Sequence, residues 1–410
     1  MLDIQFIRDN PEKVKKGVAA KQFDPALVDR VLELDERRKS LIKEVEELRA
    51  QRNKLAKAKD IEGGKKIKEE LKKNEPEFEK VEKEFKEVLG KIPNIPADDV
   101  KIGKDESENE VVRKWGEPTK FNFEPKDHLE IGKSLGIIDV ERAGKVSGSR
   151  FAYLKGDAVL LEFALVNFAL ETLSKEGFIP IVPPVLIKKE SMAGMGYLEY
   201  SGGDDMFMLD KDGLVLVGTS EQSIGPMHMN EILEAKDLPR RYVGFSSCFR
   251  REAGSYGKDT SGILRVHQFD KVEMFSYTLP EKSDEEHEYL LSIEEKFLQA
   301  LKIPYQVVKM CTGDIGLPFI RKYDLEAWIP SQGKYRELTS TSNATDYQAR
   351  RLNIRYRGTD EAKYVHMLNG TAFAIGRTII AILENYQQKD GSVIVPEVLR
   401  KWVGKEKIST

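Results

Sequence analysis

The sequence predicts an α+β fold with a mainly antiparallel sheet flanked by helices and an N-terminal antiparallel coiled-coil hairpin. Two observations predict it. Apolar residues repeat with heptad spacing on both sides of a short glycine turn at Gly63-Gly64, which is typical of paired helices. Farther along, long strand-like runs follow one another with few helices between them, which favours an antiparallel sheet over a doubly wound one. The chain has no glycine-rich dinucleotide or Walker-type fingerprint.

The hairpin is expected over residues 27–92, and its apolar positions step by four and three residues. The first helix carries Leu27, Val31, Leu34, Leu41, Val45, Leu48 and Leu55. The second carries Ile67, Leu71, Phe78, Val81, Phe85, Val88 and Ile92, with Asn74 at the position between Leu71 and Phe78. Arg38 and Arg52 occupy seam positions of the first helix. Pro76 falls inside the second helix, so we expect it to kink that helix or to begin a new one with Asn74 as its cap.

The turn end of this arm is basic. Between residues 49 and 73, ten lysines and arginines face four acidic residues. A solvated helix surface shows the same composition, whereas a paired helical arm with a positive end suits a phosphate backbone. The proline-rich run 93–97 and the polar run 103–110 follow, and they predict a linker between domains at 1–102 and 103–410.

The second domain is expected to mix helices with a larger number of strands. Helices are expected near 127–135, 155–174, 219–234, 283–301 and 373–387. Strands are expected near 179–182, 214–217, 242–250, 263–277, 305–310, 323–329, 334–341 and 363–370.

Composition excludes several classes of protein. The net charge is −3 over 410 residues, so any nucleic-acid contact must come from a local patch. Cys248 and Cys311 are the only cysteines, which excludes a disulfide scaffold and a multi-thiolate zinc site. The start of the chain does not resemble a signal peptide, and no run approaches the ~20 apolar residues of a membrane span. We therefore expect a cytoplasmic protein without a membrane anchor.

One predicted hairpin of strands carries polar residues suited to a nucleotide. Arg250 and Glu252 share one strand face, and the second strand presents Arg265, His267, Phe269, Lys271 and Glu273 on one face. A surface hairpin would alternate in a similar way. However, Phe269 interrupts the charged side, and an arginine, a carboxylate and an aromatic ring together can hold a phosphate, a purine amino group and a purine ring.

Polar pairs at two other strand ends suit a small ligand with an ammonium and a hydroxyl. They are Thr219 with Glu221, and Asn369 with Thr371. Each pair can also be a helix cap or a turn, and Thr219 in particular can cap the helix that follows it.

Two further features point to phosphate and metal. Arg377 begins an apolar helix, where a cation opposes the helix dipole, and a phosphate partner would offset that cost. Glu337 and Ser340 offer hard oxygen ligands suitable for Mg²⁺. The five histidines are scattered, so we expect a site that works by position and charge, without a protein nucleophile.

These segments resemble the three motifs of class II aminoacyl-tRNA synthetases. The run 177–184 resembles motif 1, the dimerisation element, at about 177–186. The runs 249–252 and 265–273 resemble motif 2, at about 245–275, and the run 369–377 resembles motif 3, at about 367–385. Within the class, the chain is similar to bacterial-type seryl-tRNA synthetases over nearly its whole length. The runs that carry this similarity are 1–4, 219–221, 252–255, 265–273, 311–314, 326–330 and 348–351, together with the hairpin.

The resemblance implies a class II synthetase fold and a serine–tRNA ligase. Such an enzyme activates L-serine with ATP to seryl-adenylate and pyrophosphate. It then transfers serine to the 3′ end of tRNA(Ser), with tRNA(Sec) as a second candidate acceptor. It also implies a homodimer. A ligase of the same fold that charges a carrier protein would normally lack the arm. A non-catalytic RNA-binding paralogue should have lost some of Arg250, Glu252, Glu273 or Arg377.

The resemblance also implies the roles of single residues. Arg250, Glu252 and Arg377 would be catalytic. The serine-binding residues would be Thr219, Ser220, Glu221, Glu273, Asn369 and Thr371. The ATP-binding residues would be Arg250, Arg251, Glu252, Val266, Phe269, Glu337, Leu338, Thr339, Ser340 and Arg377. Glu337 and Ser340 would hold Mg²⁺.

Overall fold

The computed structural model describes residues 1–198, 204–253, 262–358 and 361–410. The chain forms two compact units, Met1–Ile95 and Pro96–Thr410. The division falls after Ile95, whereas the sequence placed the domain boundary after residue 102.

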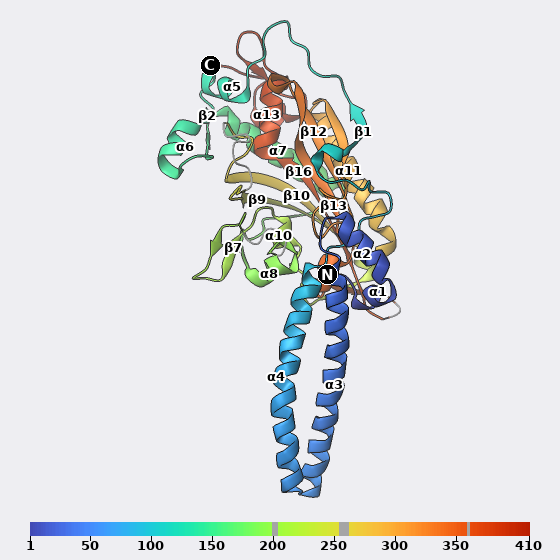
Figure 1. Ribbon diagram of the computed structural model, residues 1–410. Coiled ribbons are helices and arrows are strands. Elements are labelled where there is room, and N and C mark those ends of the chain that lie inside the picture. Colours follow the sequence, from blue (N-terminus) through green and yellow to red (C-terminus); the bar gives the residue numbers. More distant parts are fainter. Residues whose placement is uncertain (199–203, 254–261, 359–360) are drawn as a thin grey trace. The chain divides into compact units, whose positions relative to one another are not determined.

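The first unit is helical, and most of it is a hairpin of two long helices (Figure 1). Its four helices are α1 (Ile4–Asp9), α2 (Pro11–Ala20), α3 (Ala26–Ala58) and α4 (Ile61–Lys91). Val45, Ile67 and Leu71 form a buried cluster between α3 and α4. Ion pairs cross the same seam from Arg37 to Glu77 at 2.5 Å and from Arg49 to Glu75 at 2.9 Å. The predicted coiled-coil hairpin is therefore present.

The turn between the two helices lies before the glycines, and our prediction of a break at Gly63-Gly64 was wrong. Lys59 adopts a left-handed conformation with φ 58° and ends α3. The Asp60 side chain then accepts a hydrogen bond from the Gly63 backbone N–H at 2.9 Å and caps α4. The two glycines belong to the first turn of α4, because an acidic N-cap and a left-handed residue are sufficient to reverse the chain.

Pro76 lies inside a continuous helix, so the predicted new helix capped by Asn74 does not form. The α4 helix runs from Ile61 to Lys91 without interruption. A proline removes one backbone hydrogen bond and costs about 3 kcal/mol in a helix interior. Packing against α3 on both sides of Pro76, through Leu71 and Phe85, keeps the helix in register despite that cost.

The second unit is built on an eight-stranded sheet, which is mainly antiparallel as predicted (Figure 1). Its strands, in spatial order, are β1 (Glu110–Trp115), β11 (Tyr305–Lys309), β12 (Arg321–Ile329), β13 (Lys334–Asn343), β16 (His366–Ala374), β10 (Gln268–Thr278), β9 (Arg240–Phe249) and β4 (Ile179–Ile181). Among the described pairings of this sheet, only β4 with β9 is parallel.

Helices α7 (Asp157–Lys175), α11 (Ser283–Ala300) and α13 (Ile375–Asn385) cover the sheet. Leu165 of α7, Phe297 of α11 and Ile379 of α13 are fully or almost fully buried in one core with sheet residues such as Leu325 and Val272. This core fixes the three central strands, β10, β13 and β16, whose polar residues are considered below.

Smaller elements complete the unit. They are α5 (His128–Ser134), β2 (Ile138–Asp139), α6 (Val140–Ser147), β3 (Tyr153–Leu154), β5 (Leu186–Lys188), α8 (Lys189–Gly194), β6 (Met208–Leu209), β7 (Leu214–Leu216), α10 (Glu221–Ile224), β8 (Ile232–Glu234), α12 (Tyr347–Leu352), β14 (Arg355–Arg357), β15 (Lys363–Tyr364), β17 (Val393–Ile394), α14 (Arg400–Val403) and β18 (Lys407–Ile408). None of the helices in the described ranges combines the length and apolar character that a membrane span requires.

Two predicted elements differ from the structure, and one strand of the large sheet was not predicted. The helix expected over 219–234 is reduced to the single turn α10, and strand β10 begins at Gln268, five residues later than expected from the run 263–277. Strand β1 was not predicted because all six of its residues are exposed, so it lacks the alternation that marks a half-buried strand. The middle of the glycine-containing loop in motif 2 lies outside the described residues.

Candidate active site

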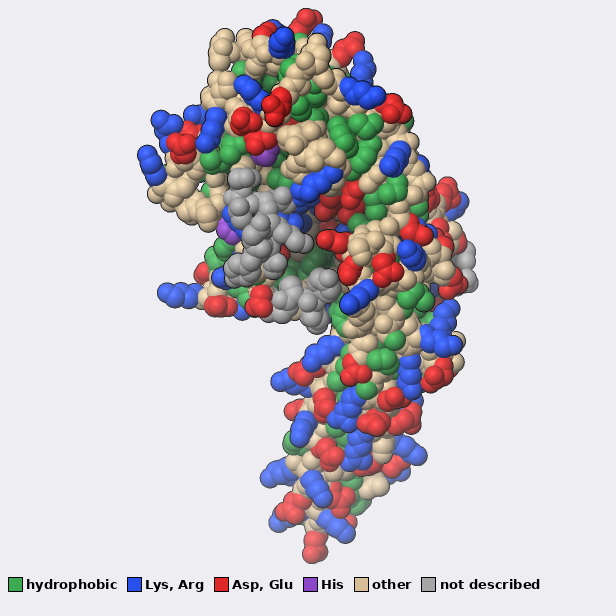
Figure 2. Space-filling model, turned by 45° about the horizontal axis from the view of Figure 1, so that its top comes forward, with side chains coloured by type: hydrophobic (Ala, Val, Ile, Leu, Met, Phe, Trp, Pro, Cys, Tyr) green, Lys and Arg blue, Asp and Glu red, His purple; other side chains and the backbone are tan. Residues whose placement is uncertain are grey.

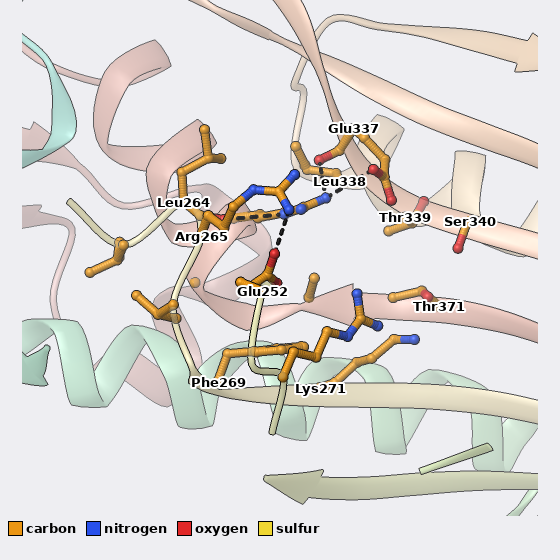
Figure 3. A pocket seen from close by; sticks show the side chains of 16 residues that line it. Glu252, Leu264, Arg265, Phe269, Lys271, Glu337, Leu338, Thr339, Ser340 and Thr371 are labelled. Atoms are coloured by element: carbon orange, nitrogen blue, oxygen red, sulfur yellow. Dashed lines mark hydrogen bonds and ion pairs between the residues drawn. The ribbon is translucent and has the colours of Figure 1, made fainter. Parts of the chain in front are cut away.

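Two adjoining pockets lie over the central strands. The first, pocket A, is lined by Arg250, Glu252, Ile263, Leu264, Arg265, Val266, Phe269, Lys271, Glu337, Leu338, Thr339, Ser340, Thr371, Ala374, Gly376 and Arg377. Figure 3 shows Phe269 and Lys271 on one strand, with Thr371 on a second and Glu337 to Ser340 on a third. Nine of the ten residues expected to bind ATP are therefore brought together here, and Arg251 is the exception.

At the base of pocket A, an arginine packs against an aromatic ring. The Arg250 guanidinium lies 5.3 Å from the centre of the Phe269 ring, and its Nε donates to the Gly218 carbonyl at 3.1 Å. Both contacts hold the guanidinium in one orientation, which suits a fixed phosphate contact. The exposed part of the Phe269 ring offers a stacking surface for a planar base.

Glu252 and Arg265, which come from the two separate runs of motif 2, pair across pocket A. The Arg265 guanidinium donates to the Glu252 carboxylate (Figure 3). Glu252 has a left-handed backbone with φ 52°, because the chain turns away after β9 ends at Phe249. We expected Arg250 and Glu252 to share a strand face, and Arg265 and His267 to lie on the next strand. Instead, all four residues lie beyond the strand ends.

An ion pair links β13 to the start of α13 in the same pocket. Arg377 Nη1 lies 3.3 Å from Glu337 Oε2 and donates to the Glu337 carbonyl at 3.0 Å. Burial alone would raise the pKa of Glu337, but the nearby Arg377, Lys322 and Arg250 outweigh it and bring the pKa to about 2. Glu337 is therefore an anion, and Arg377 already has an anionic partner on the first turn of its helix.

The second pocket, pocket B, contains three of the four polar residues predicted at strand ends, Thr219, Glu221 and Asn369, whereas Thr371 lines pocket A. It is lined by Tyr197, Asp205, Met206, Gly218, Thr219, Glu221, Gln222, Phe249, Arg250, Lys271, Asp314, Ile315, Gly316, Phe319, Lys322, Glu337, Ser340, Ser342 and Asn369. Glu221 accepts from the Tyr197 hydroxyl at 2.7 Å and also from the Asn369 side-chain amide. Burial, followed by the charge of Glu273, raises the pKa of Glu221 to about 7.

A second carboxylate lies beside pocket B on β10. Glu273 is 1% exposed, and a bulge between Val272 and Glu273 brings it directly opposite Thr371 of β16. The Thr371 hydroxyl donates to Glu273 Oε2 at 3.2 Å, and Lys271 Nζ lies 2.5 Å from the same oxygen. Lys271 also donates to the Thr219 hydroxyl at 3.1 Å. One polar cluster thus joins four residues from three segments of the chain.

Three expected site residues direct the polar groups of their side chains away from the two pockets. Ser220 is fully buried and lines neither pocket, because its hydroxyl lies against Gly244 of β9. The Arg251 guanidinium lies 5.9 Å from the Phe207 ring centre, outside pocket A. The Thr339 hydroxyl donates at 2.7 Å to Glu294 of α11, beneath the sheet, so this side chain does not offer its hydroxyl to pocket A.

Sequence reasoning missed three polar residues of the site. Tyr197 comes from a segment far from the motifs, and nothing in its local sequence indicates the contact with Glu221. Arg265 and Lys271 were placed on a polar strand face without a role. The signal that was available for Lys271 is its spacing, since residues two apart on a strand point to the same side, and Glu273 is two residues away.

Glu337 and Ser340 fit a magnesium ion that is held mainly by phosphates and water. Glu337 supplies an ionised carboxylate, and Ser340 supplies a hydroxyl at the junction of the two pockets. Mg²⁺ prefers such hard oxygens and usually keeps only one or two protein ligands beside substrate phosphates. No group of three or more His, Cys, Asp or Glu ligands occurs within the described ranges.

The two pockets share Arg250, Lys271, Glu337 and Ser340. A nucleotide in pocket A and a small polar molecule in pocket B would therefore meet at these residues. Such an arrangement can align a carboxylate with a phosphate and neutralise the charge that develops between them.

Family models match both units of the chain. Residues 1–96 match "Seryl-tRNA synthetase N-terminal domain", and residues 207–386 match "tRNA synthetase class II core domain (G, H, P, S and T)". The serine–tRNA ligase of Acidothermus cellulolyticus is 49% identical over 98% of both chains, and that of Dictyoglomus turgidum is 46% identical over 98% of both.

Solved structures agree with this similarity. The seryl-tRNA synthetase of Pyrococcus horikoshii, complexed with ATP, superposes with a TM-score of 0.93 at 42% identity, over 100% of this chain and 99% of that one. The cytoplasmic enzyme of Naegleria fowleri, in complex with AMP, gives 0.91 at 36% identity over the same shares.

Proposed function

The chain belongs to the seryl-tRNA synthetase family, and on that premise we propose how its own residues activate serine with ATP and pass it to tRNA. Members of this family are serine–tRNA ligases. One observation carries the proposal: pocket A and pocket B meet at Arg250, Glu337 and Ser340. The serine carboxylate must reach the α-phosphate of ATP, and this junction is where the two substrates would touch.

ATP is proposed to occupy pocket A. Its adenine would stack on Phe269 beside the Val266 backbone, with Glu252 accepting from the adenine amino group. Arg250 would hold the α-phosphate, and Arg377 would meet the γ-phosphate. A magnesium ion at Glu337 and Ser340 would draw negative charge from the phosphates when bound. The relative from Pyrococcus horikoshii, solved in complex with ATP, supports ATP as the nucleotide.

Serine is proposed to occupy pocket B. Its ammonium would meet Glu221, which Tyr197 and Asn369 already orient. Its hydroxyl would meet Glu273 and Thr371, and Thr219 would complete the pocket. Alanine lacks the hydroxyl and would leave these buried polar groups unpaired, which discriminates strongly.

The reaction then needs no protein nucleophile. The serine carboxylate attacks the α-phosphorus, the bond to the bridging oxygen breaks, and pyrophosphate leaves. The 3′-terminal hydroxyl of the tRNA next attacks the seryl carbonyl and releases AMP. Fixed cations at the junction stabilise the charge of the phosphorus transition state.

The arm is proposed to bind the tRNA backbone. Within the described structure, Arg49 is the only one of the ten cations between residues 49 and 73 that forms an ion pair. Lysine and arginine side chains are exposed along the arm (Figure 2). Unpaired exposed cations are the groups that contact phosphates. The acceptor would be tRNA(Ser), and tRNA(Sec) is a second candidate.

A homodimer and a cytoplasmic location complete the proposal. Four apolar side chains on α7, on β4 and just after β4 expose between 41% and 85% of their surface, as expected of an uncovered interface. They are Leu160, Phe163, Ile179 and Val182. Cys248 and Cys311 are both free and buried, which fits a reducing compartment.

Serine-dependent exchange of labelled pyrophosphate into ATP tests the proposal. Exchange should depend on serine and be weak with alanine or threonine. Exchange driven by a different amino acid, or by none of them, would contradict it.

A further inference from the structure

Lys271 is a buried cation of the active site to which none of the roles above assigns a task. It is 7% exposed and lines both pocket A and pocket B. Its Nζ lies 2.5 Å from Glu273 Oε2 and 3.1 Å from the Thr219 hydroxyl oxygen. Figure 3 shows its side chain beside that of Phe269 on β10, with Thr371 across the pocket.

The ion pair determines what Glu273 can bind. Burial raises the pKa of the Glu273 carboxyl, and Lys271 is the strongest influence that opposes this rise. Arg250 also opposes the rise, and the charge of Glu273 in turn affects Glu221, Glu294, Tyr197 and Cys248. Of Glu221 and Glu273, only Glu273 has a lysine within ion-pair distance in the described structure, since Glu221 accepts hydrogen bonds from the neutral side chains of Tyr197 and Asn369.

A substrate ammonium would therefore gain more from Glu221 than from Glu273, whose charge is already balanced. Glu273 is left as an acceptor of hydrogen bonds, oriented by Lys271 and by the Thr371 hydroxyl. An ionised acceptor that loses its donor in a buried site costs more than a neutral one. By opposing the rise in the pKa of Glu273, Lys271 thus favours its charged form, which strengthens the rejection of a substrate that lacks a hydroxyl.

We propose that Lys271 is a positioning residue for specificity: it holds Glu273 as the hydrogen-bond acceptor for the substrate hydroxyl and ties that acceptor to Thr219. This inference rests on the proposed function, because it takes serine as the occupant of pocket B. It assigns to Lys271 a role in choosing the amino acid and none in binding ATP.

The test compares Lys271→Met, Lys271→Arg and Glu273→Gln with the double variant that combines Lys271→Met and Glu273→Gln. Lys309→Met is the matched control, since Lys309 is 12% exposed and pairs with Asp99 away from both pockets. The readout is kcat/KM for pyrophosphate exchange with serine and with alanine, together with KM for ATP.

Lys271→Met should lower the serine-to-alanine ratio of kcat/KM at least about tenfold, mainly through a higher KM for serine, while KM for ATP changes less than about threefold. Lys271→Arg should restore most of the ratio. In the double variant the ratio should match that of Glu273→Gln alone, because two residues that act as one unit are not additive. Lys309→Met should leave the ratio at the wild-type value.

An unchanged ratio in Lys271→Met, or additive effects in the double variant, would overturn the inference. So would a rise in KM for ATP that equals the rise for serine, because Lys271 would then act on the phosphates. If Lys271→Met does not fold, the double variant, which leaves no unpaired charge, and Lys271→Arg still decide the question. Wild-type enzyme without serine-dependent exchange would refute the proposed function itself, whereas wild-type exchange with an unchanged variant ratio refutes only the role of Lys271.

Discussion

Burial of a single carboxyl group should make serine binding depend on pH near neutrality. The pKa of Glu221 is raised to about 7, first by burial and second by the charge of Glu273, and only the ionised form attracts an ammonium. We therefore expect kcat/KM for serine to fall about tenfold per pH unit below pH 7, while KM for ATP does not follow this change. A flat serine profile between pH 6 and 8 would contradict the role of Glu221.

The raised pKa of Glu221 affects protein stability in the opposite direction to serine binding: it favours the folded state at low pH. A carboxyl whose pKa is raised on folding stabilises the folded chain most below its unfolded value of 4.5, and that contribution disappears as pH rises through about 7. Serine favours the ionised form. The increase in melting temperature that serine produces should thus be larger at pH 8 than at pH 6.

Arg250 should be essential for adenylate formation. Its guanidinium is fixed by Gly218 and Phe269 at the junction of the two pockets. Removing a preorganised charge that stabilises a transition state costs about 100-fold or more in rate, so Arg250→Ala should lower exchange by at least that factor. Arg251→Ala should cost less than about tenfold, because its guanidinium faces Phe207. Equal losses in the two variants would contradict this distinction.

At the scale of elements, the sequence predicted best where periodicity and burial agree. The helices α3, α7, α11 and α13 and the strands β9, β12 and β13 lie close to their expected positions, because each buries one face. The helix expected over 219–234 failed, since Gly225 and Pro226 follow Ile224 and the next residues bond to a distant part of the chain, as Asn230 does to the Leu352 carbonyl. Tyr197 was missed for the same reason: its partner Glu221 is 24 residues away, and strand or helix spacing says nothing about such a contact.

Removing positive charge from the turn end of the helical arm should weaken tRNA binding. Changing Lys65, Lys66 and Lys68 to glutamine should weaken tRNA charging and leave pyrophosphate exchange intact, because these exposed side chains lie at the turn end of α4. The dependence of tRNA affinity on salt should become shallower, by about 0.9 in the log–log slope for each phosphate that the variant no longer neutralises.

Changing Lys80 and Lys83 to glutamine provides the control. Both side chains are exposed on α4, but they lie toward the end of the helix that is far from the turn. This pair should change charging much less. If both sets of substitutions weakened charging equally, general electrostatic attraction would explain the effect, and the turn end would have no special role.

At the scale of the whole molecule, an uncovered apolar stripe predicts self-association. Leu160 and Phe163 are exposed on one face of α7, at 41% and 51%, and Ile179 is exposed at 50% on β4. Strand β4 ends the sheet, so its outer backbone groups lack a partner strand within the described sheet. An exposed edge next to apolar side chains is the kind of surface that proteins cover by association, and two copies related by a twofold axis would cover it on both.

Phe163→Glu should therefore shift the protein from dimer to monomer, as measured by light scattering across a range of concentrations. Two buried carboxylates without partners would be placed in the interface, and each would lose its hydration. Leu186→Glu is the comparison, because Leu186 is 39% exposed on β5 in a separate small sheet and should leave the mass unchanged. If Phe163→Glu stayed dimeric while Leu186→Glu became monomeric, the interface would lie on the small sheet, and the edge at β4 would be free.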